Sequence, residues 1–485
     1  MKLIQGFFFF ALLLAAYASF TPLIAQDEDD HDFDNRVNKL VDNVYRSIDD
    51  QLGTYIFTDE PRTTSYKDAN DDDDDDNTLN VVIHKEKRHS RSDYQLSYSL
   101  NTTTHSYYPT PLTFNSINYY PTENLSDNVL FRYNRVEGLF LGLNSPKDYS
   151  WNYHDIRLFG SGGYGFAAHR WRYNGGIAEQ FGTGSHMFEF GAEGHSFTDS
   201  DDKWIVSQSE NNVAALLTRD DYRDYFGREG FSVWTGFYRK PVASWSYNLQ
   251  VAYLIDRYES LDRITNWSVF GGDKVFHDNP AIDEGHMKSI LATLEIQKLQ
   301  ERKIFTSGWT SAFSFEHSSP SLRSDFDFDR YLADIRRYQP FSSYDNLNLR
   351  VRAGAATGNV PAQKILAIGG ISTLPAFGYK DFAGNRLLLA NAEYLVNGKM
   401  FDDAELFPSW LLRNMNLILF MDAGYVSSVA DNSIVKGFEN LNASTVKSDW
   451  GFGFGTRDAK FRLGFAWRMD ISEPVHAFIR FERPF

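Results

Sequence analysis

Residues 368–396 read IGGISTLPAFGYKDFAGNRLLLANAEYLV. The first half of this stretch is rich in glycine and proline, which favour turns and unusual backbone angles over regular elements. The same half carries Ile371, Leu374 and Phe377, apolar side chains that need something to pack against. Long loops of this kind fold into a protected space and usually have a function. From Arg386 onward the pattern is that of a strand, so the stretch predicts a buried loop that leads directly into a strand.

Alternating strands flank this loop on both sides. Apolar side chains recur at every second position in residues 347–353 and 461–467, whereas Arg350, Arg352, Arg462 and Arg468 fall on the other set. The 485 residues include 40 Phe, 27 Tyr and 34 Gly. Outward apolar and inward polar alternation, with abundant aromatic residues, is typical of a membrane barrel wall. The sequence therefore predicts an all-β fold, a transmembrane antiparallel β-barrel.

The number of strands follows from the spacing of such segments. Candidate strands lie at 131–143, 154–163, 167–179, 183–195, 229–240, 243–257, 286–300, 306–317, 325–338, 343–356, 386–397, 411–425, 447–456, 458–470 and 473–483. These are fifteen, and single-chain bacterial barrels use even numbers. A further strand over 94–100 brings the expected total to sixteen; twelve or fourteen follow if some segments are extracellular hairpins. Two long inserts, 200–230 with a helical pattern over 210–225, and 260–284, are expected outside the membrane.

The N-terminal part predicts export and a short periplasmic segment. Residues 1–25 have a positive start and an apolar core shorter than the ~20 residues of a spanning helix, as in a cleaved signal peptide. Residues 26–91 contain an amphipathic helical pattern and six consecutive aspartates at 71–76, which are expected to form a solvated linker. A short strand is expected over 79–83. Residues 92–485 are assigned to the barrel.

The loop and two further segments resemble the BamA/TamA-type bacterial surface-antigen barrels. The matching residues are Gly369, Gly370, Leu374, Gly378, Tyr379, Gly384, Asn385, Glu393 and Tyr394 in the loop and its strand, residues 134–138 near the first strand, and Phe420, Asp422 and Gly424 in a wall strand. The resemblance implies an outer-membrane location, a loop folded into the lumen, and a role in membrane protein assembly or in the translocation of polypeptide or lipid. It covers the barrel only, because no repeated unit of POTRA size precedes it, and it implies a branch that lacks these domains.

One position departs from the family pattern. Phe377 stands where the family has an arginine that meets an acidic residue of the wall, and Lys380 or Arg386 is the nearest replacement cation. The resemblance implies that Gly378 and Tyr379 lie against the inner wall near Asp422. Without the arginine, the assembly activity is in doubt.

The chain ends in an alternating strand with Phe481 and the terminal Phe485. These residues resemble the signal that outer-membrane barrels present to the machinery that inserts them. The partners expected are therefore the outer-membrane bilayer and that machinery, with a client polypeptide or lipid that the sequence does not identify.

The sequence offers little for catalysis. It has no cysteine, no paired-histidine metal motif and no Gly-x-Ser-x-Gly, so no catalytic residue, metal site or cofactor is assigned. The formal net charge of -16 argues against nucleic acid. A passive porin or structural barrel is the alternative. An outer-membrane lipase or protease comes last, because a lumen-facing polar face also accounts for Asp325, Asp327 and Asp329.

Overall fold

The computed structural model describes two compact units, Gly6–His105 and the rest of the chain. The described residues are 64–66, 79–83, 98–101, 124–126, 128–147, 149, 153–239, 245–270, 272–301, 306–342, 344–401, 415–456 and 461–481. The signal peptide, the amphipathic N-terminal helix and the aspartate run all fall outside them and stay predictions. In the smaller unit, β1 (Thr64–Tyr66), β2 (Leu79–Ile83) and β3 (Tyr98–Asn101) form an antiparallel sheet in that order.

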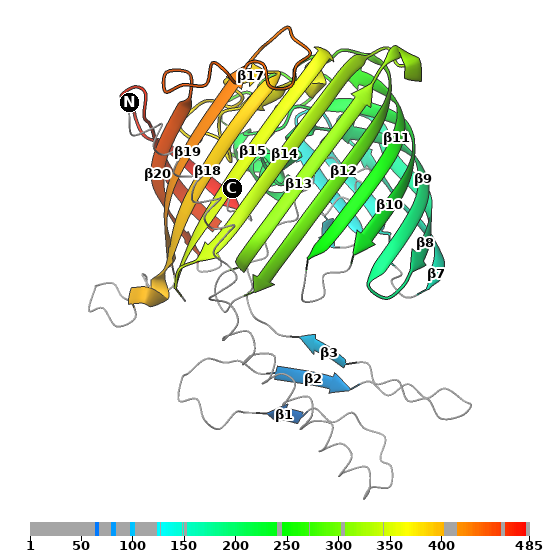
Figure 1. The fold of residues 1–485 in the computed structure, drawn as a ribbon, viewed down its shortest axis with the longest axis horizontal. Helices are drawn as coiled ribbons and strands as arrows, with labels where there is room; N and C mark the ends of the chain where they lie inside the picture. The colour runs from blue at the N-terminus through cyan, green and yellow to red at the C-terminus, as the bar shows by residue number, and fades with distance from the viewer. Residues whose placement is uncertain are drawn as a thin grey trace, which may run out of the picture. The chain divides into compact units, whose positions relative to one another are not determined.

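The larger unit is an antiparallel sheet of sixteen strands that curls into a barrel (Figure 1). They are β5 (Val129–Asn134), β6 (Gly138–Ser145), β7 (His154–Gly165), β8 (Arg170–Gly182), β9 (His186–Asp199), β10 (Phe226–Arg239), β11 (Ser246–Ser260), β12 (Gly285–Glu301), β13 (Thr306–Ser318), β14 (Asp327–Pro340), β15 (Asp345–Asn359), β18 (Arg386–Asn397), β19 (Met415–Ser427), β20 (Lys447–Thr456), β21 (Phe461–Arg468) and β22 (His476–Phe481). The three-residue β4 (Asn124–Ser126) lies between β22 and β5 in the strand order. The predicted fold class and strand number are confirmed.

The sixteenth strand is not the one expected from the sequence. Of the segment predicted over 94–100, the structure describes residues 98–100, and these belong to β3, which pairs with β2. Instead, the predicted strand 131–143 is two strands, β5 and β6. Asn134 Oδ1 accepts hydrogen bonds from the backbone N–H groups of Val136 (3.1 Å) and Glu137 (2.7 Å), and Gly138 adopts φ +66°. An asparagine that bonds its own backbone and a glycine at positive φ are the residues a tight turn requires.

The two faces of the sheet differ in polarity as the alternation predicts. Leu158 is 74% exposed and Trp171 is 68% exposed on the outer face. On the lumen face, Arg350 and Arg352 are buried and both bond Asp334 of the neighbouring strand, at 2.6 and 2.9 Å. An apolar outside with a polar inside is the arrangement that a lipid environment favours.

The long insert between β9 and β10 contains the 3-10 helix η1 (Asp201–Trp204) and α3 (Gln208–Thr218). The helix expected over 210–225 begins earlier because Ser207 caps it, its hydroxyl accepting from Glu210 N. It ends earlier because Arg219 adopts the left-handed conformation, φ 61°. Shorter elements connect other strands: η2 (Pro320–Leu322), η3 (Ala362–Lys364), β16 (Leu366–Ile368), β17 (Phe382–Gly384) and η4 (Gly398–Phe401).

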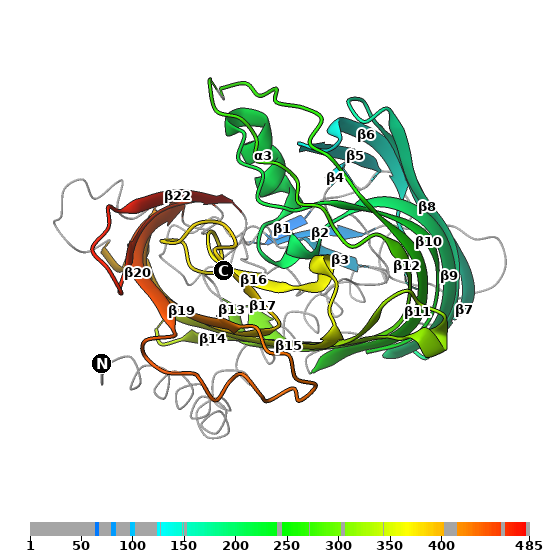
Figure 2. The same ribbon diagram turned by 90° about the horizontal axis from the view of Figure 1, so that it is seen from above.

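The loop between β15 and β18 folds into the lumen, as predicted, and its β16 and β17 lie inside the ring of strands in Figure 2. Ile368, Leu374 and Phe377 are buried and pack with wall residues Leu387 and Leu389 of β18. The lumen therefore supplies the protected space that the apolar loop needs. Among the residues that the structure describes, no helix has the length and apolar character to cross a membrane.

Candidate functional site at the lumen loop and the strand seam

The loop starts with a glycine turn that only glycine can form. Gly369 and Gly370 have φ of +124° and +81°. A Cβ on Gly369 would lie 2.4 Å from the carbonyl oxygen of Gly378, so the two arms of the loop touch at this point. Gly370 and Leu374 exchange two backbone hydrogen bonds of 3.0 Å. The turn therefore fixes the following residues against the wall.

Phe377, which stands where the sequence resemblance would place an arginine, is packed under a wall arginine. Its ring meets that of Phe382 at 5.4 Å, and the Arg468 guanidinium of β21 lies 4.4 Å from its centroid. A guanidinium over an aromatic face is attracted by the ring quadrupole. In this chain the wall supplies the cation and the loop supplies the aromatic ring.

The tip of the loop reaches the β9–β10 insert and not the wall near Asp422. The Tyr379 hydroxyl donates to Asp202 Oδ2 (3.0 Å), and Lys380 Nζ bonds Asp202 (2.8 Å) and Asp224 (2.7 Å). The predicted contact of Gly378 and Tyr379 with Asp422 is therefore wrong. The insert supplies two carboxylates, Asp202 and Asp224, that bond the loop tip, whereas Asp422 bonds Asn391.

Asp422 belongs to a different part of the loop interface. Its Oδ1 accepts from Asn391 Nδ2 (2.7 Å), and Asn391 also donates to the carbonyl oxygen of Thr373 (3.1 Å). Asp449, directly opposite Asp422 in the β19–β20 register, accepts from the backbone N–H of Ala376 (2.8 Å). Asn391 and Asp449, the neighbours of Asp422, thus hold the loop at Thr373 and Ala376.

The other two wall-motif residues also face the loop or its surroundings. A Cβ on Gly424 would lie 2.4 Å from Ile368 Cδ1, so the glycine allows close approach of the loop. Phe420 packs edge-on against Phe478 of β22, with centroids 5.8 Å apart.

Neither candidate replacement cation serves Asp422. Lys380 binds the insert, as described above. Arg386 is fully buried and donates to carbonyl oxygens of Ala356, Asn385, Asp431, Ser433 and Lys436. It therefore ties the base of the lumen loop to the β19–β20 loop.

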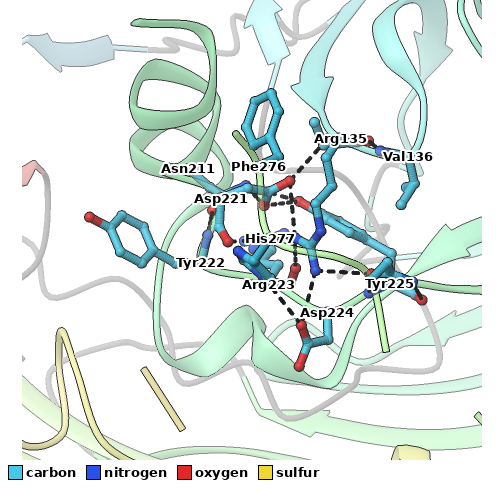
Figure 3. A network of polar contacts seen from close by, with 12 residues as sticks. Arg135, Val136, Asn211, Asp221, Tyr222, Arg223, Asp224, Tyr225, Phe276 and His277 are labelled. Atoms are coloured by element: carbon cyan, nitrogen blue, oxygen red, sulfur yellow. Dashed lines mark hydrogen bonds and ion pairs between the residues drawn. The ribbon is translucent and has the colours of Figure 1, made fainter. Parts of the chain in front are cut away.

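Arg135 extends the network from the loop tip to the start of the barrel (Figure 3). Its side chain, fully buried in the β5–β6 turn, lies 3.2 Å from Asp221 and 3.0 Å from Asp224, and donates to Asn279 at 3.0 Å. Asp224 is therefore shared between Arg135 and Lys380. The β5–β6 turn, the β9–β10 insert, the β11–β12 loop and the lumen loop are joined by one chain of polar contacts.

We call the contacts of Lys380 and Arg135 with the carboxylates of the β9–β10 insert the clamp. The opposite charges within the clamp stabilise one another. Burial disfavours the ionised form of Asp224, but the nearby His277 ring, 3.8 Å away, and the charges of Lys380 and Arg135 outweigh it and hold the pKa of Asp224 well below its usual range. Burial likewise opposes the charge on Lys380, yet Asp202 and Asp224 raise the pKa of Lys380 above its usual value. The loop tip is therefore held by ionised groups at neutral pH.

Helix α3 occupies the seam between the first and last long strands (Figure 2). Asn212 accepts from the backbone N–H of Tyr133 (3.0 Å) and donates to the carbonyl oxygen of Phe131 (3.1 Å), both on β5. Two residues earlier, about half a turn round the helix, Glu210 bonds Arg480 of β22 at 2.8 Å. A helix side chain thus satisfies an edge of β5 that a neighbouring strand would otherwise satisfy.

Sequence reasoning did not single out Asp202, Asp224, Asn212 or Glu210. They lie in a segment predicted to be an external insert, and no periodicity pairs them with their partners. The one available signal was the polar, partly helical character of an unusually long insert. Phe481 ends β22, opposite Phe461 in the register, whereas Phe485 lies outside the described residues, so the insertion signal stays a prediction.

Histidine and carboxylate side chains do form contacts near one rim. His317 Nδ1 lies 2.7 Å from Asp329 Oδ1, but within the described chain no serine hydroxyl is bonded to His317. The nearby Ser319 hydroxyl bonds Ser321 instead. Across the described ranges, no three His, Asp or Glu side chains are grouped so as to hold a metal ion.

Comparisons with known proteins give only distant likenesses. No family model matches the chain, and no curated protein matches it. Among solved structures, the chain is similar to BamA from Haemophilus ducreyi lacking POTRA domains 1–3 (14% identity, TM-score 0.44, covering 83% of this chain and 73% of that one). It is also similar to CdiB from Acinetobacter baumannii (13%, TM-score 0.37, 70% and 55%) and CdiB from Escherichia coli (12%, TM-score 0.37, 84% and 67%). Likenesses this remote do not assign the chain to a family.

Proposed function

We propose that this chain is an integral outer-membrane barrel of the surface-antigen type that inserts or translocates polypeptide, and that α3 covers the site of action. The observation that carries the proposal is the bonding of Asn212 to the β5 edge at Phe131 and Tyr133. An exposed strand edge is a template for another strand. If α3 moves, β5 offers that template to a client at the seam.

The occupied lumen favours this function over a passive pore. The lumen loop packs on β18 through an apolar cluster and is held to the β9–β10 insert by Lys380. A porin of this size needs an open aqueous channel. Here, two inserted segments fasten to each other across the space where solutes would pass.

A small number of polar contacts, on two sides of α3, must break for the helix to leave the seam. On one side it is held by the Asn212 hydrogen bonds, and on the other by the buried Glu210–Arg480 ion pair. Each contact is local, so a client strand that bonds β5 directly replaces the Asn212 bonds with backbone bonds of the same kind. The bilayer, the machinery that inserts this barrel, and an unfolded client are the partners of this proposal.

A reversible lock tests it. The sequence has no cysteine, so Tyr133→Cys with Ala215→Cys, two residues of one buried cluster, places a lone disulfide between β5 and α3. Proteoliposomes are given a urea-unfolded eight-stranded barrel, and its folding is followed on unboiled gels. The oxidised pair is expected to lose the activity and recover it on reduction.

The controls are matched. A Ser433→Cys/Lys436→Cys pair, in the β19–β20 loop where these residues form a backbone turn, is oxidised and reduced in parallel. It should keep activity in both states. Equal activity of the oxidised α3 pair, or wild-type vesicles that show steady conductance and no insertion activity, would contradict the proposal and favour the porin.

A further inference from the structure

A small cavity lies where the lumen loop meets the C-terminal strands of the wall. Loop residues Ser372 and Pro375 form one side, and lumen-facing residues of β18–β22 form the other. Its volume is about 40 Å³, and it is partly open. At ~10–15 Å³ for one water, it has room for roughly three waters, and its opening lets the rest of a larger group lie outside.

The cavity presents hydrogen-bond acceptors that lack donors. Ser372 Oγ, Asn391 Oδ1 and Glu393 Oε2 are buried and have no hydrogen-bond partner. All three residues line the cavity and are at most 8% exposed. The Asn391 and Glu393 oxygens can only accept hydrogen bonds, and the Ser372 hydroxyl can accept one as well. The missing partner is therefore a group with several N–H or O–H donors.

The surrounding charges leave a negative excess. Arg462 is matched by Glu393 at 2.8 Å, and Arg480 by Glu210 at 2.8 Å. Asp422 lines the cavity and lies directly opposite Asp449 in the β19–β20 register, and two carboxyl groups placed side by side favour a pair that shares one proton over two like charges. Their donors from Asn391 and the Ala376 backbone are neutral. One negative charge therefore has no cation beside it.

Aromatic rings complete the wall of the cavity. Phe420 and Phe478 both line it and pack edge-on against each other. Aromatic faces attract organic cations. Acceptors, net negative charge and aromatic rings together describe a recognition site for an organic cation and not for an anion or a neutral sugar.

We propose that this cavity binds the guanidinium or alkylammonium group of a small cation or of a basic side chain. The group donates to Ser372, Asn391 and Glu393 and offsets the charge of the Asp422–Asp449 pair. Its binding bridges the loop and the wall, so it fastens the lumen loop. The inference stands on this cavity alone and does not depend on the proposed insertion activity.

The test measures the melting temperature of the purified barrel in detergent with methylguanidinium, ethylammonium or tetramethylammonium chloride at equal ionic strength. Linkage predicts a saturable rise of roughly 2–5 °C near saturation for a chain of this size. Methylguanidinium, ethylammonium or both should produce this rise. Comparing the two salts shows whether the cavity prefers a guanidinium or an alkylammonium group. Tetramethylammonium has no N–H donor and should not.

Ser372→Ala locates the effect. Because the Ser372 hydroxyl has no partner in the unliganded barrel, its removal should leave the basal melting temperature almost unchanged while weakening the response several-fold. The control is Ser428→Ala, on an exposed serine of the β19–β20 loop. Equal responses to all three salts, as for a cavity that holds water only, or an undiminished response in Ser372→Ala, would overturn the proposal.

Discussion

The position of Tyr379 predicts which residues are energetically coupled to it. We expect Tyr379→Phe to be coupled to Asp202→Asn and independent of Asp422→Asn. The phenylalanine keeps the ring, which packs near Tyr222 and His277, and removes only the hydroxyl that donates to Asp202 at 3.0 Å. The substitution therefore isolates one hydrogen bond to a carboxylate.

The size of the effect follows from the remaining partners of Asp202. A hydrogen bond to a charged group is worth ~1.5–3 kcal/mol. Asp202 keeps Lys380 at 2.8 Å and the backbone N–H of Asp224 at 2.7 Å when the hydroxyl is lost. The cost of Tyr379→Phe should therefore lie at or just below the lower end of that range, ~1–1.5 kcal/mol, and the coupling with Asp202→Asn should be ~1 kcal/mol.

Urea unfolding of the barrel in lipid vesicles, followed by tryptophan fluorescence, gives the free energies for both double-mutant cycles. The Tyr379–Asp422 cycle should be additive within ~0.5 kcal/mol, because the two residues share no partner. Additivity in the Tyr379–Asp202 cycle, or coupling in the Tyr379–Asp422 cycle, would refute the assignment of the loop tip to the insert.

Four further predictions concern the clamp, for which there are two, the glycine turn and the C-terminus. Since the pKa of Asp224 is depressed, its contribution to stability is present above its unfolded value of ~3.9 and is lost as pH falls through the folded value; the melting temperature of Asp224→Asn should therefore fall less than that of wild type under acid. Conversely, the raised pKa of Lys380 gives a contribution that is complete below ~10.4 and is lost as pH rises through the folded value, which Lys380→Met should abolish in the same pH series. Gly369→Ala places a Cβ 2.4 Å from a backbone oxygen at φ +124° and should destabilise the barrel by more than ~2 kcal/mol in urea, whereas Ala367→Gly, in the adjacent short strand, should cost less than half of that. Changing Phe481 and Phe485 to Ala should leave export intact and lower the amount of heat-modifiable barrel in outer-membrane fractions; normal barrel levels would exclude these residues as the insertion signal.

The wall of the barrel was accessible from the sequence because each strand repeats a period of two. Alternation placed fourteen strands near their observed positions, and it failed at Arg135–Glu137 because apolar residues continue on both sides of that turn. The turn is instead specified by the side chain of Asn134 and by Gly138, a local hydrogen-bonding signal that hydrophobic periodicity does not report.

The loop could be assigned to the lumen from its composition, but its partners could not. Lys380 and Asp202 are 178 residues apart in the sequence. No sequence pattern distinguishes Asp202 from the other carboxylates of the chain, so the pairing becomes evident only in the folded structure. Asp422 was expected to bind the loop tip, whereas its neighbours Asn391 and Asp449 bind loop residues Thr373 and Ala376. The sequence singled out Phe377 without its partner, and the packing of Arg468 over its ring became evident only from the register of β21.

The central claim is that α3 covers the β5 edge and leaves it when a client arrives. Spin labels at Val213 on the exposed side of α3 and at Leu141 on the outer face of β6 report the distance between helix and sheet in proteoliposomes. We expect one short distance for the resting barrel and a second, longer one when an unfolded barrel client is added and inserts. An unchanged distance distribution while the client inserts would contradict it.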